Sequence, residues 1–250
     1  MVERDRCLTG IKGLDEILNG GIPLGNTVLV TGTVGTGKTT FGMEFLVRGS
    51  MKGENTAFIS VTEPSAKMLE NMRTYTFFDD KLISQNKLHI FDLQVIYDRL
   101  GLERLEYDVD DLDVLLGAFE DIVDELHITR LVIDSITAIC FQMKNKASIR
   151  KFLFNLGQFL STFGCTTFLI SETIVEAGVQ KYSVFGVEEA IVDGIILLGN
   201  IYRKGDLLRT LQVVKMRGTR HSRATYVTDL TPEGFDFVPL LKWGSEREYH

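Results

Sequence analysis

Short apolar runs rich in β-branched residues alternate along the chain with segments in which apolar residues recur every three or four positions. Such runs are typical of buried parallel strands, and the recurrence of apolar residues every three or four positions is typical of helices that cover a sheet. The runs predict strands at 27–30, 56–62, 87–93, 130–135 and 165–172. This alternation indicates an α/β fold with a mostly parallel central sheet flanked by helices.

The helical spacing is clearest at residues 112–126, and similar apolar stripes occur at 41–52 and 152–160. Each stripe predicts a helix whose apolar face joins the core. Two stretches carry no such period. We expect the acidic stretch 94–110 to be irregular and residues 174–186 to form a loop.

The pattern changes at Gly194. Two strand-like runs there are joined by a polar turn at 203–206, and another run from about residue 224 is followed by a turn at 232–234. Strands joined by such short turns are antiparallel. No linker, repeat or low-complexity segment interrupts the chain, so we expect a single domain of residues 1–250, with a C-terminal antiparallel extension of its sheet.

The composition is that of an ordinary globular protein, with 250 residues, 44% hydrophobic and 24% charged. No apolar run approaches the ~18 residues that a membrane span needs, and no secretory signal is evident, so we expect a cytoplasmic protein without a membrane partner. Cys7, Cys140 and Cys165 form no C-x-x-C pair, which argues against a zinc ribbon. The net charge of −7 argues against a protein that coats nucleic acid.

A glycine-rich loop follows the first strand and opens into a helix. Its sequence GTVGTGKT is the complete G-x-x-x-x-G-K-[ST] phosphate-loop signature. Glycines let the backbone close around a phosphate, and backbone amides at a helix N-terminus favour anions. We therefore expect a nucleoside triphosphate with Mg²⁺, with Lys38 on the β- and γ-phosphates and the Thr39 hydroxyl on the metal. The expected nucleotide contacts are Thr33, Val34, Gly35, Thr36, Gly37, Lys38, Thr39 and Thr40.

Two carboxylates follow predicted strands, at the sheet edge where ligands bind in open α/β folds. Asp134 ends the apolar strand 130–135 and is the expected acid beside Mg²⁺. Glu63 follows strand 56–62 and has two interpretations. It is either a solvated residue at a helix start or the carboxylate that polarises the attacking water.

Two basic clusters stand out in this acidic chain. Residues 144–151 carry four cations at a helix start, for which a solvated face is the favoured interpretation over a nucleic-acid or subunit contact. Residues 215–223 read KMRGTRHSR and include Lys215, Arg217 and His221. For this cluster we favour phosphate binding over a solvated hairpin, the phosphate belonging to nucleic acid or to a nucleotide held by an adjacent subunit.

Taken in order, several motifs resemble the KaiC-like branch of the RecA superfamily, over about residues 8–238. They are GLDEILNGGIPLGN, the phosphate loop, VTEP, LVIDS, GVEEAIVDGIILL and KMRGTRH. The resemblance implies a RecA-like P-loop ATPase core assembled as a homo-oligomeric ring, usually a hexamer, with ATP at each subunit interface. One departure is Thr62, where the family often has a second acid before Glu63.

The resemblance also implies roles for individual residues. Glu63 is the implied catalytic carboxylate, Asp134 the acid associated with Mg²⁺, and Thr74 a contact on the base or ribose side. Lys215, Arg217 and His221 are implied to reach the ATP of the adjacent subunit, with Lys215 and Arg217 in an arginine-finger role.

The favoured functional hypothesis is a ring-forming regulatory or signalling ATPase with a protein partner. One alternative is a DNA-repair or recombination accessory ATPase that binds single-stranded DNA. Another is a nucleotide-dependent scaffold that hydrolyses little, which Thr62 favours, or an autokinase whose acceptor the sequence does not identify.

Overall fold

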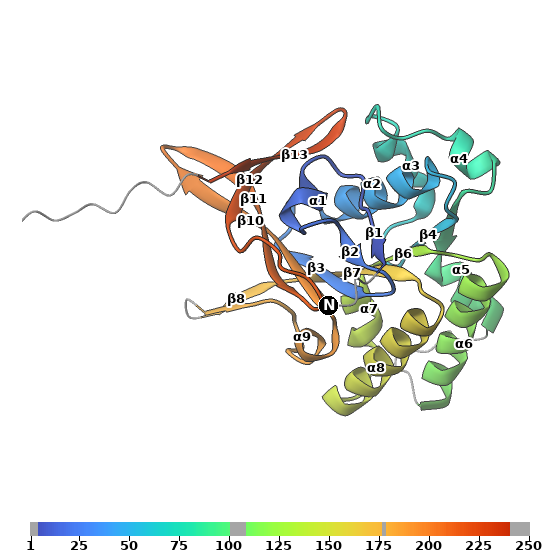
Figure 1. The fold of residues 1–250 in the computed structure, drawn as a ribbon. Helices are drawn as coiled ribbons and strands as arrows, with labels where there is room; N and C mark the ends of the chain where they lie inside the picture. Colours follow the sequence, from blue (N-terminus) through green and yellow to red (C-terminus); the bar gives the residue numbers. More distant parts are fainter. Residues whose placement is uncertain (1–4, 101–108, 177–178, 241–250) are drawn as a thin grey trace, which may run out of the picture.

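A nine-stranded sheet forms the centre of the computed structural model, which describes residues 5–100, 109–176 and 179–240 (Figure 1). Its strand order is β13-β12-β11-β10-β3-β7-β6-β4-β5. The parallel strands are β3 (Thr27–Gly32), β4 (Thr56–Ser60), β5 (Leu88–Asp92), β6 (Arg130–Asp134), β7 (Thr166–Glu172) and β10 (Gly194–Arg203). The antiparallel strands are β11 (Asp206–Met216), β12 (Thr225–Thr231) and β13 (Gly234–Pro239). The predicted α/β architecture with its antiparallel extension is confirmed.

Helices cover both faces of the sheet because side chains alternate along each buried strand. One face packs against α2 (Lys38–Ser50), α1 (Leu14–Ile17), α3 (Ser65–Met72) and α4 (Lys81–Ser84). The other packs against α5 (Leu93–Leu100), α6 (Val109–Glu125), α7 (Ile136–Phe141) and α8 (Lys146–Thr162). In β3, Val28 and Val30 face α2, whereas Leu29 belongs to the opposite core cluster. Among the described residues, no helix is long and apolar enough to span a membrane.

Two sequence-based expectations were wrong. The stretch 94–110 is not irregular throughout, because α5 occupies its first part and α6 begins at Val109, while residues 101–108 lie outside the described residues. Leu93 and Tyr97 are buried on one side of α5. Gln94 donates a hydrogen bond to Asp98 on another side of the helix. The expected loop 174–186 instead contains an antiparallel pair, β8 (Ile174–Glu176) and β9 (Val179–Lys181).

The N-terminal lead-in is fixed to the core by a buried arginine at the start of β6. β1 (Arg6–Cys7) and β2 (Ile22–Pro23) pair beside α1. Arg130 is 1% exposed and donates hydrogen bonds to the carbonyl oxygens of Leu8, Thr9 and Phe45. Its guanidinium also forms an ion pair with Glu54, with 2.5 Å between Nη2 and Oε1. Because a buried charge is tolerated only when it is fully partnered, these contacts account for its position.

Candidate functional site

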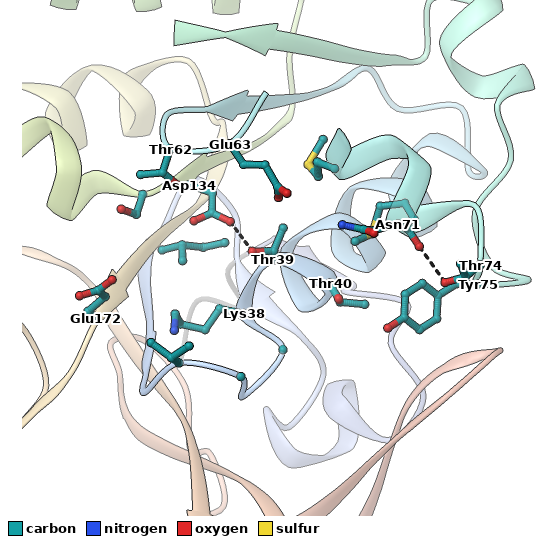
Figure 2. Close-up of a pocket in the computed structure, with 17 residues that line it drawn as sticks. Lys38, Thr39, Thr40, Thr62, Glu63, Asn71, Thr74, Tyr75, Asp134 and Glu172 are labelled. Carbon is teal, nitrogen blue, oxygen red and sulfur yellow. Dashed lines mark hydrogen bonds between the residues drawn. The ribbon is translucent and has the colours of Figure 1, made fainter. Parts of the chain in front are cut away.

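A cavity of about 670 Å³ lies where the parallel strands end. Its walls come from the loop after β3, the first turn of α2, the ends of β6 and β7, and the segment around α3 (Figure 2). The register places Gly32 beside Glu172, Ile170 beside Asp134, and Asp134 beside Ser60. The carboxyl ends therefore gather at one edge, as expected for an open α/β sheet.

Glycines shape the loop that follows β3. Gly35 and Gly37 have φ of 79° and 91°, which side chains other than glycine rarely adopt. A methyl group at Gly37 would also lie 3.0 Å from the Phe235 ring, and one at Gly32 would collide with the Leu198 carbonyl oxygen. The Thr36 hydroxyl closes the loop by donating to the Thr33 carbonyl oxygen at 2.9 Å. The loop thus presents backbone amides at the N-terminus of α2, which is a suitable site for phosphate.

Lys38 is the cation of this loop. Its ammonium donates to the carbonyl oxygens of Gly32 at 2.8 Å and Thr33 at 2.9 Å, so the side chain folds back over the loop. Burial lowers the pKa of Lys38, and the carboxylates of Asp134 and Glu172 oppose that decrease. Glu172 ends β7 and lines the cavity, but the sequence identified only its place at the site edge.

Two oxygen donors meet beside Lys38. The Thr39 hydroxyl donates to Asp134 Oδ2 at 2.6 Å, which joins the first turn of α2 to the end of β6 (Figure 2). Burial raises the pKa of Asp134, and the Thr39 hydrogen bond and Lys38 oppose that rise. The peptide bond between Asp134 and Ser135 is cis. A hydroxyl and a carboxylate suit Mg²⁺, which takes few protein oxygens together with phosphate and water ligands. In the described part of the chain no group of three or more His, Cys, Asp or Glu forms another candidate metal site.

Glu63 lies on the same cavity, after β4. The Ser60 hydroxyl donates to the Glu63 carbonyl oxygen at 2.5 Å, and Asp92 caps α3 by accepting from the Ser65 amide at 2.7 Å. The turn that carries Glu63 is therefore held at both ends. The Glu63 side chain is 35% exposed and lies 3.4 Å from the Lys67 ammonium. Thr62 also lines the cavity, where no side chain supplies a second carboxylate before Glu63.

The far end of the cavity has a wall of different character. Thr74, Tyr75 and Asn71 line it, opposite Glu172 in Figure 2. The Thr74 hydroxyl donates to the Asn71 carbonyl oxygen at 2.7 Å, and the Tyr75 ring stacks on Phe77 with centroids 5.4 Å apart. The sequence pointed to Thr74 alone. Tyr75 directly follows it, whereas only the helical geometry of α3 places Asn71 there.

Lys215, Arg217 and His221 do not reach this cavity in the same chain. Met216 pairs with Gly194, which pairs with Val28 near the start of β3, so the cluster lies at the amino ends of the parallel strands. His221 contacts the neighbouring Ser222 carbonyl oxygen.

The two cations of this cluster are held by the segment before β10, which includes α9 (Glu188–Ile191). Lys215 donates to the carbonyl oxygens of Glu189 and Val192, and Arg217 pairs with Asp193 at 3.3 Å. Burial, together with the nearby Arg217, lowers the pKa of Lys215.

The GVEE motif builds the turn before that segment. Glu188 is buried and accepts hydrogen bonds from the amides of Phe185 and Val187, while Glu189 accepts from the Tyr182 amide. Both acids therefore shape the backbone that holds Lys215.

The other basic cluster is a surface feature. Lys144, Lys146, Arg150 and Lys151 are all exposed around the start of α8, where Asn145 caps the helix. None of them lines the cavity.

Comparisons with known proteins agree with this geometry. A family model described as "ATPase: KaiC" matches residues 7–242. A UPF0273 protein of Thermotoga maritima is 35% identical over 94% of this chain and 96% of its own length. The circadian clock oscillator protein KaiC of Synechococcus elongatus is 33% identical over 93% of this chain but only 44% of its own length, so the chain spans about half of that protein.

A solved structure supports the same relationship. The KaiC-like protein of the hyperthermophilic archaeon Pyrococcus horikoshii matches 95% of this chain and 100% of its own with a TM-score of 0.80 and 32% identity. A family model that covers nearly the whole chain, together with a match of this quality, establishes the relationship. The chain therefore belongs to the KaiC-like ATPase family.

Proposed function

We propose that this protein is an ATPase that binds ATP with Mg²⁺ in the cavity at the carboxyl edge of the sheet and works as a ring with shared sites. The observation that carries the proposal is the joint placement of Lys38, the Thr39–Asp134 pair and Glu63 around one cavity. Its volume of about 670 Å³ is in the range of small-molecule sites.

Each residue has a distinct task. The loop amides and Lys38 bind the phosphates, and Thr39 and Asp134 hold the metal. Mg²⁺ supplies charge neutralisation on the phosphate oxygens. Glu63 accepts a hydrogen bond from the attacking water and orients it toward the γ-phosphate. Thr74 contacts the base or ribose.

Subunit assembly completes the site. Lys215 and Arg217 lie at the amino edge, away from the cavity of their own chain, as a residue that serves a neighbouring subunit must. In a closed ring each subunit presents one edge to the next, so that each ATP meets the cations of a neighbour. We propose a hexamer and a regulatory role exerted through a protein partner.

Steady-state ATP hydrolysis by wild type, Glu63→Gln and Glu70→Gln tests this proposal. Glu70 is an exposed residue of α3, the helix that follows Glu63, and does not line the cavity, so its substitution is the matched control. We expect slow turnover in wild type and Glu70→Gln, and a loss of about 10²-fold or more in Glu63→Gln with ATP binding retained. ATP binding without turnover in the assembled wild type would instead favour the scaffold function.

The exposed cations at the start of α8 keep the DNA-dependent alternative open to test. The same assay with single-stranded DNA decides it, because a DNA-coupled ATPase is stimulated in a salt-dependent way. We expect no stimulation. Strong stimulation that is lost in Lys146→Ala/Arg150→Ala would replace the regulatory role with the DNA-repair role.

A further inference from the structure

The β12–β13 turn, taken as residues 232–235 and so including the first two residues of β13, contacts both the phosphate-loop helix and the segment that forms the far wall of the cavity (Figure 1). Its partner residues are distant in sequence, since Glu44 and Phe235 are 191 positions apart. None of the site roles described above uses this turn.

The first contact is with a buried carboxylate of α2. Glu44 is fully buried, accepts a hydrogen bond from the Phe235 amide at 2.9 Å and pairs with Arg48 at 2.9 Å. Burial raises the pKa of Glu44, and the Phe235 amide and Arg48 oppose that rise. Gly234 has a φ of 118°, and a methyl group there would collide with the Glu44 carboxylate. The approach of the turn to α2 therefore requires glycine.

The second contact runs through Arg48. Its guanidinium donates to the Glu233 carbonyl oxygen at 2.7 Å, and its Cζ lies 5.8 Å from the centre of the Phe77 ring. Arg48 thus joins the helix, the turn and the segment after α3. A guanidinium suits this position because its donors form a rigid fork.

The third contact reaches the cavity wall directly. The amide and the hydroxyl of Thr76 donate to the Pro232 carbonyl oxygen at 2.8 and 3.1 Å. Thr76 directly follows Thr74 and Tyr75, which line the cavity, and Phe77 supports the Tyr75 ring from behind. The turn therefore fixes the backbone on which that wall is built.

The phosphate loop rests on the same hairpin. The Phe235 ring packs edge-to-face against Phe41, with centroids 5.3 Å apart, and also lies against Gly37. A side chain at position 37 would therefore crowd the Phe235 ring. One hairpin thus supports both the phosphate side and the opposite wall. Because packed protein segments are rigid, the distance between the phosphate loop and the far wall of the cavity depends on this hairpin.

We propose that the β12–β13 turn, through Glu44, Arg48 and Thr76, positions the Thr74–Tyr75 wall and so sets the affinity of the site for the nucleoside part of its ligand. The inference rests on the proposed ATP site and adds positioning residues to it. Arg48 and Thr76 donate their hydrogen bonds to Glu44, Glu233 and Pro232 and not to the phosphate loop, so their substitution is expected to leave phosphate binding unchanged.

Calorimetric titration with ATP and with inorganic tripolyphosphate, both with Mg²⁺, tests the proposal. We expect Arg48→Met to lower ATP affinity about tenfold, because a charge-assisted hydrogen bond is lost, and to change tripolyphosphate affinity less than about twofold. Thr76→Val keeps the hydrogen bond of the amide. It is expected to lower ATP affinity by about two- to threefold and to leave tripolyphosphate affinity unchanged. This milder variant serves if Arg48→Met fails to fold.

Lys12→Met is the matched control, because Lys12 forms an exposed ion pair with Asp236 of β13 without touching the turn or the wall. It is expected to bind both ligands as wild type does. Equal losses for ATP and tripolyphosphate, or no loss in the folded variants, would overturn the positioning role and leave ATP binding intact. A wild-type protein that binds neither ligand would overturn the ATP site itself.

Discussion

The two edges of the parallel sheet hold their functional side chains in different ways. At the carboxyl edge, Thr39 and Asp134 bond directly to each other and Lys38 folds over its own loop. At the amino edge, Lys215 bonds to backbone carbonyl oxygens and Arg217 pairs with Asp193, which is part of the same scaffold. The carboxyl edge therefore opens on a cavity, whereas at the amino edge both cations are held by the segment before β10.

In the proposed ring, this difference assigns the two groups of one chain to two different sites. Folding of one chain fixes the phosphate loop, but it leaves Lys215 and Arg217 at the opposite ends of the parallel strands. A shared site makes hydrolysis depend on assembly, since the neighbour supplies charge only when it is present.

The largest effect is expected when one residue of each edge is substituted in separate variants. Lys38→Ala and Lys215→Ala are each expected to lose about 10³-fold in turnover, the first with loss of ATP binding and the second without it. An equal mixture of the two is expected to recover about a quarter of wild-type activity, because one site in four combines an intact loop with an intact neighbour. Hydrolysis assays after exchange of subunits measure the recovery.

Lys204→Ala is the control for that experiment, since Lys204 is an exposed turn residue between β10 and β11. Its turnover is expected to match wild type. If the mixture recovers no activity although its subunits exchange, Lys215 does not act on the ATP of a neighbouring subunit.

An intermediate effect is expected at Asp134 of the carboxyl edge. Asp134→Asn keeps a partner for Thr39 but removes the charge, so Mg²⁺-dependent ATP affinity is expected to fall about 10- to 100-fold. Burial raises the pKa of Asp134 in the folded state above its value in the unfolded state. The charged form of Asp134 therefore lowers the stability of the folded state at neutral pH. The neutral variant is therefore expected to gain about 2–4 °C in Tm near pH 7.

That gain is expected to vanish as the pH falls below 3.8, the ordinary value for the group, where folded and unfolded forms are both protonated. Thermal melts across pH measure it, with the exposed Asp113→Asn as control. A lower Tm for Asp134→Asn at pH 7 would show that the carboxylate is net stabilising.

The smallest effect concerns how Glu63 is held. Its ion pair with Lys67 is exposed, and such pairs contribute only about 0.3–0.5 kcal/mol. Lys67→Gln is therefore expected to change turnover by less than about threefold, because the Ser60 and Asp92 hydrogen bonds hold the turn. A steady-state assay suffices, and a tenfold change would assign Lys67 a direct part in orienting Glu63.

Local signals predicted most of the parallel half. The run 27–30, the glycine loop and the helix after it are contiguous, so one window of sequence contains the whole unit. The end of β6 at Asp134 was predictable for the same reason. The helix α5 was missed because, among its residues of described burial, two are buried, Leu93 and Tyr97, and they lie next to an acidic stretch.

Long-range contacts were not predictable. The hydrogen bonds of Thr76 to Pro232 and of Phe235 to Glu44 join segments more than 150 positions apart. A buried glutamate on α2 looks like any polar helix residue in the sequence, since its partner approaches only in the folded chain. Likewise, the sequence identified Lys215 as a candidate phosphate ligand but not the backbone oxygens that hold it.

Arg130 and Asp134 occupy the two ends of one five-residue strand. Arg130 is held at the start of β6 by the lead-in and by Glu54. Since a strand advances about 3.3 Å per residue, this fixed end also determines where Asp134, the proposed Mg²⁺ ligand, lies at the other end of the strand. A slip of a single residue would turn that acid to the opposite face. Leu8 and Thr9 thus help to fix the position of Asp134, although neither of them lines the cavity.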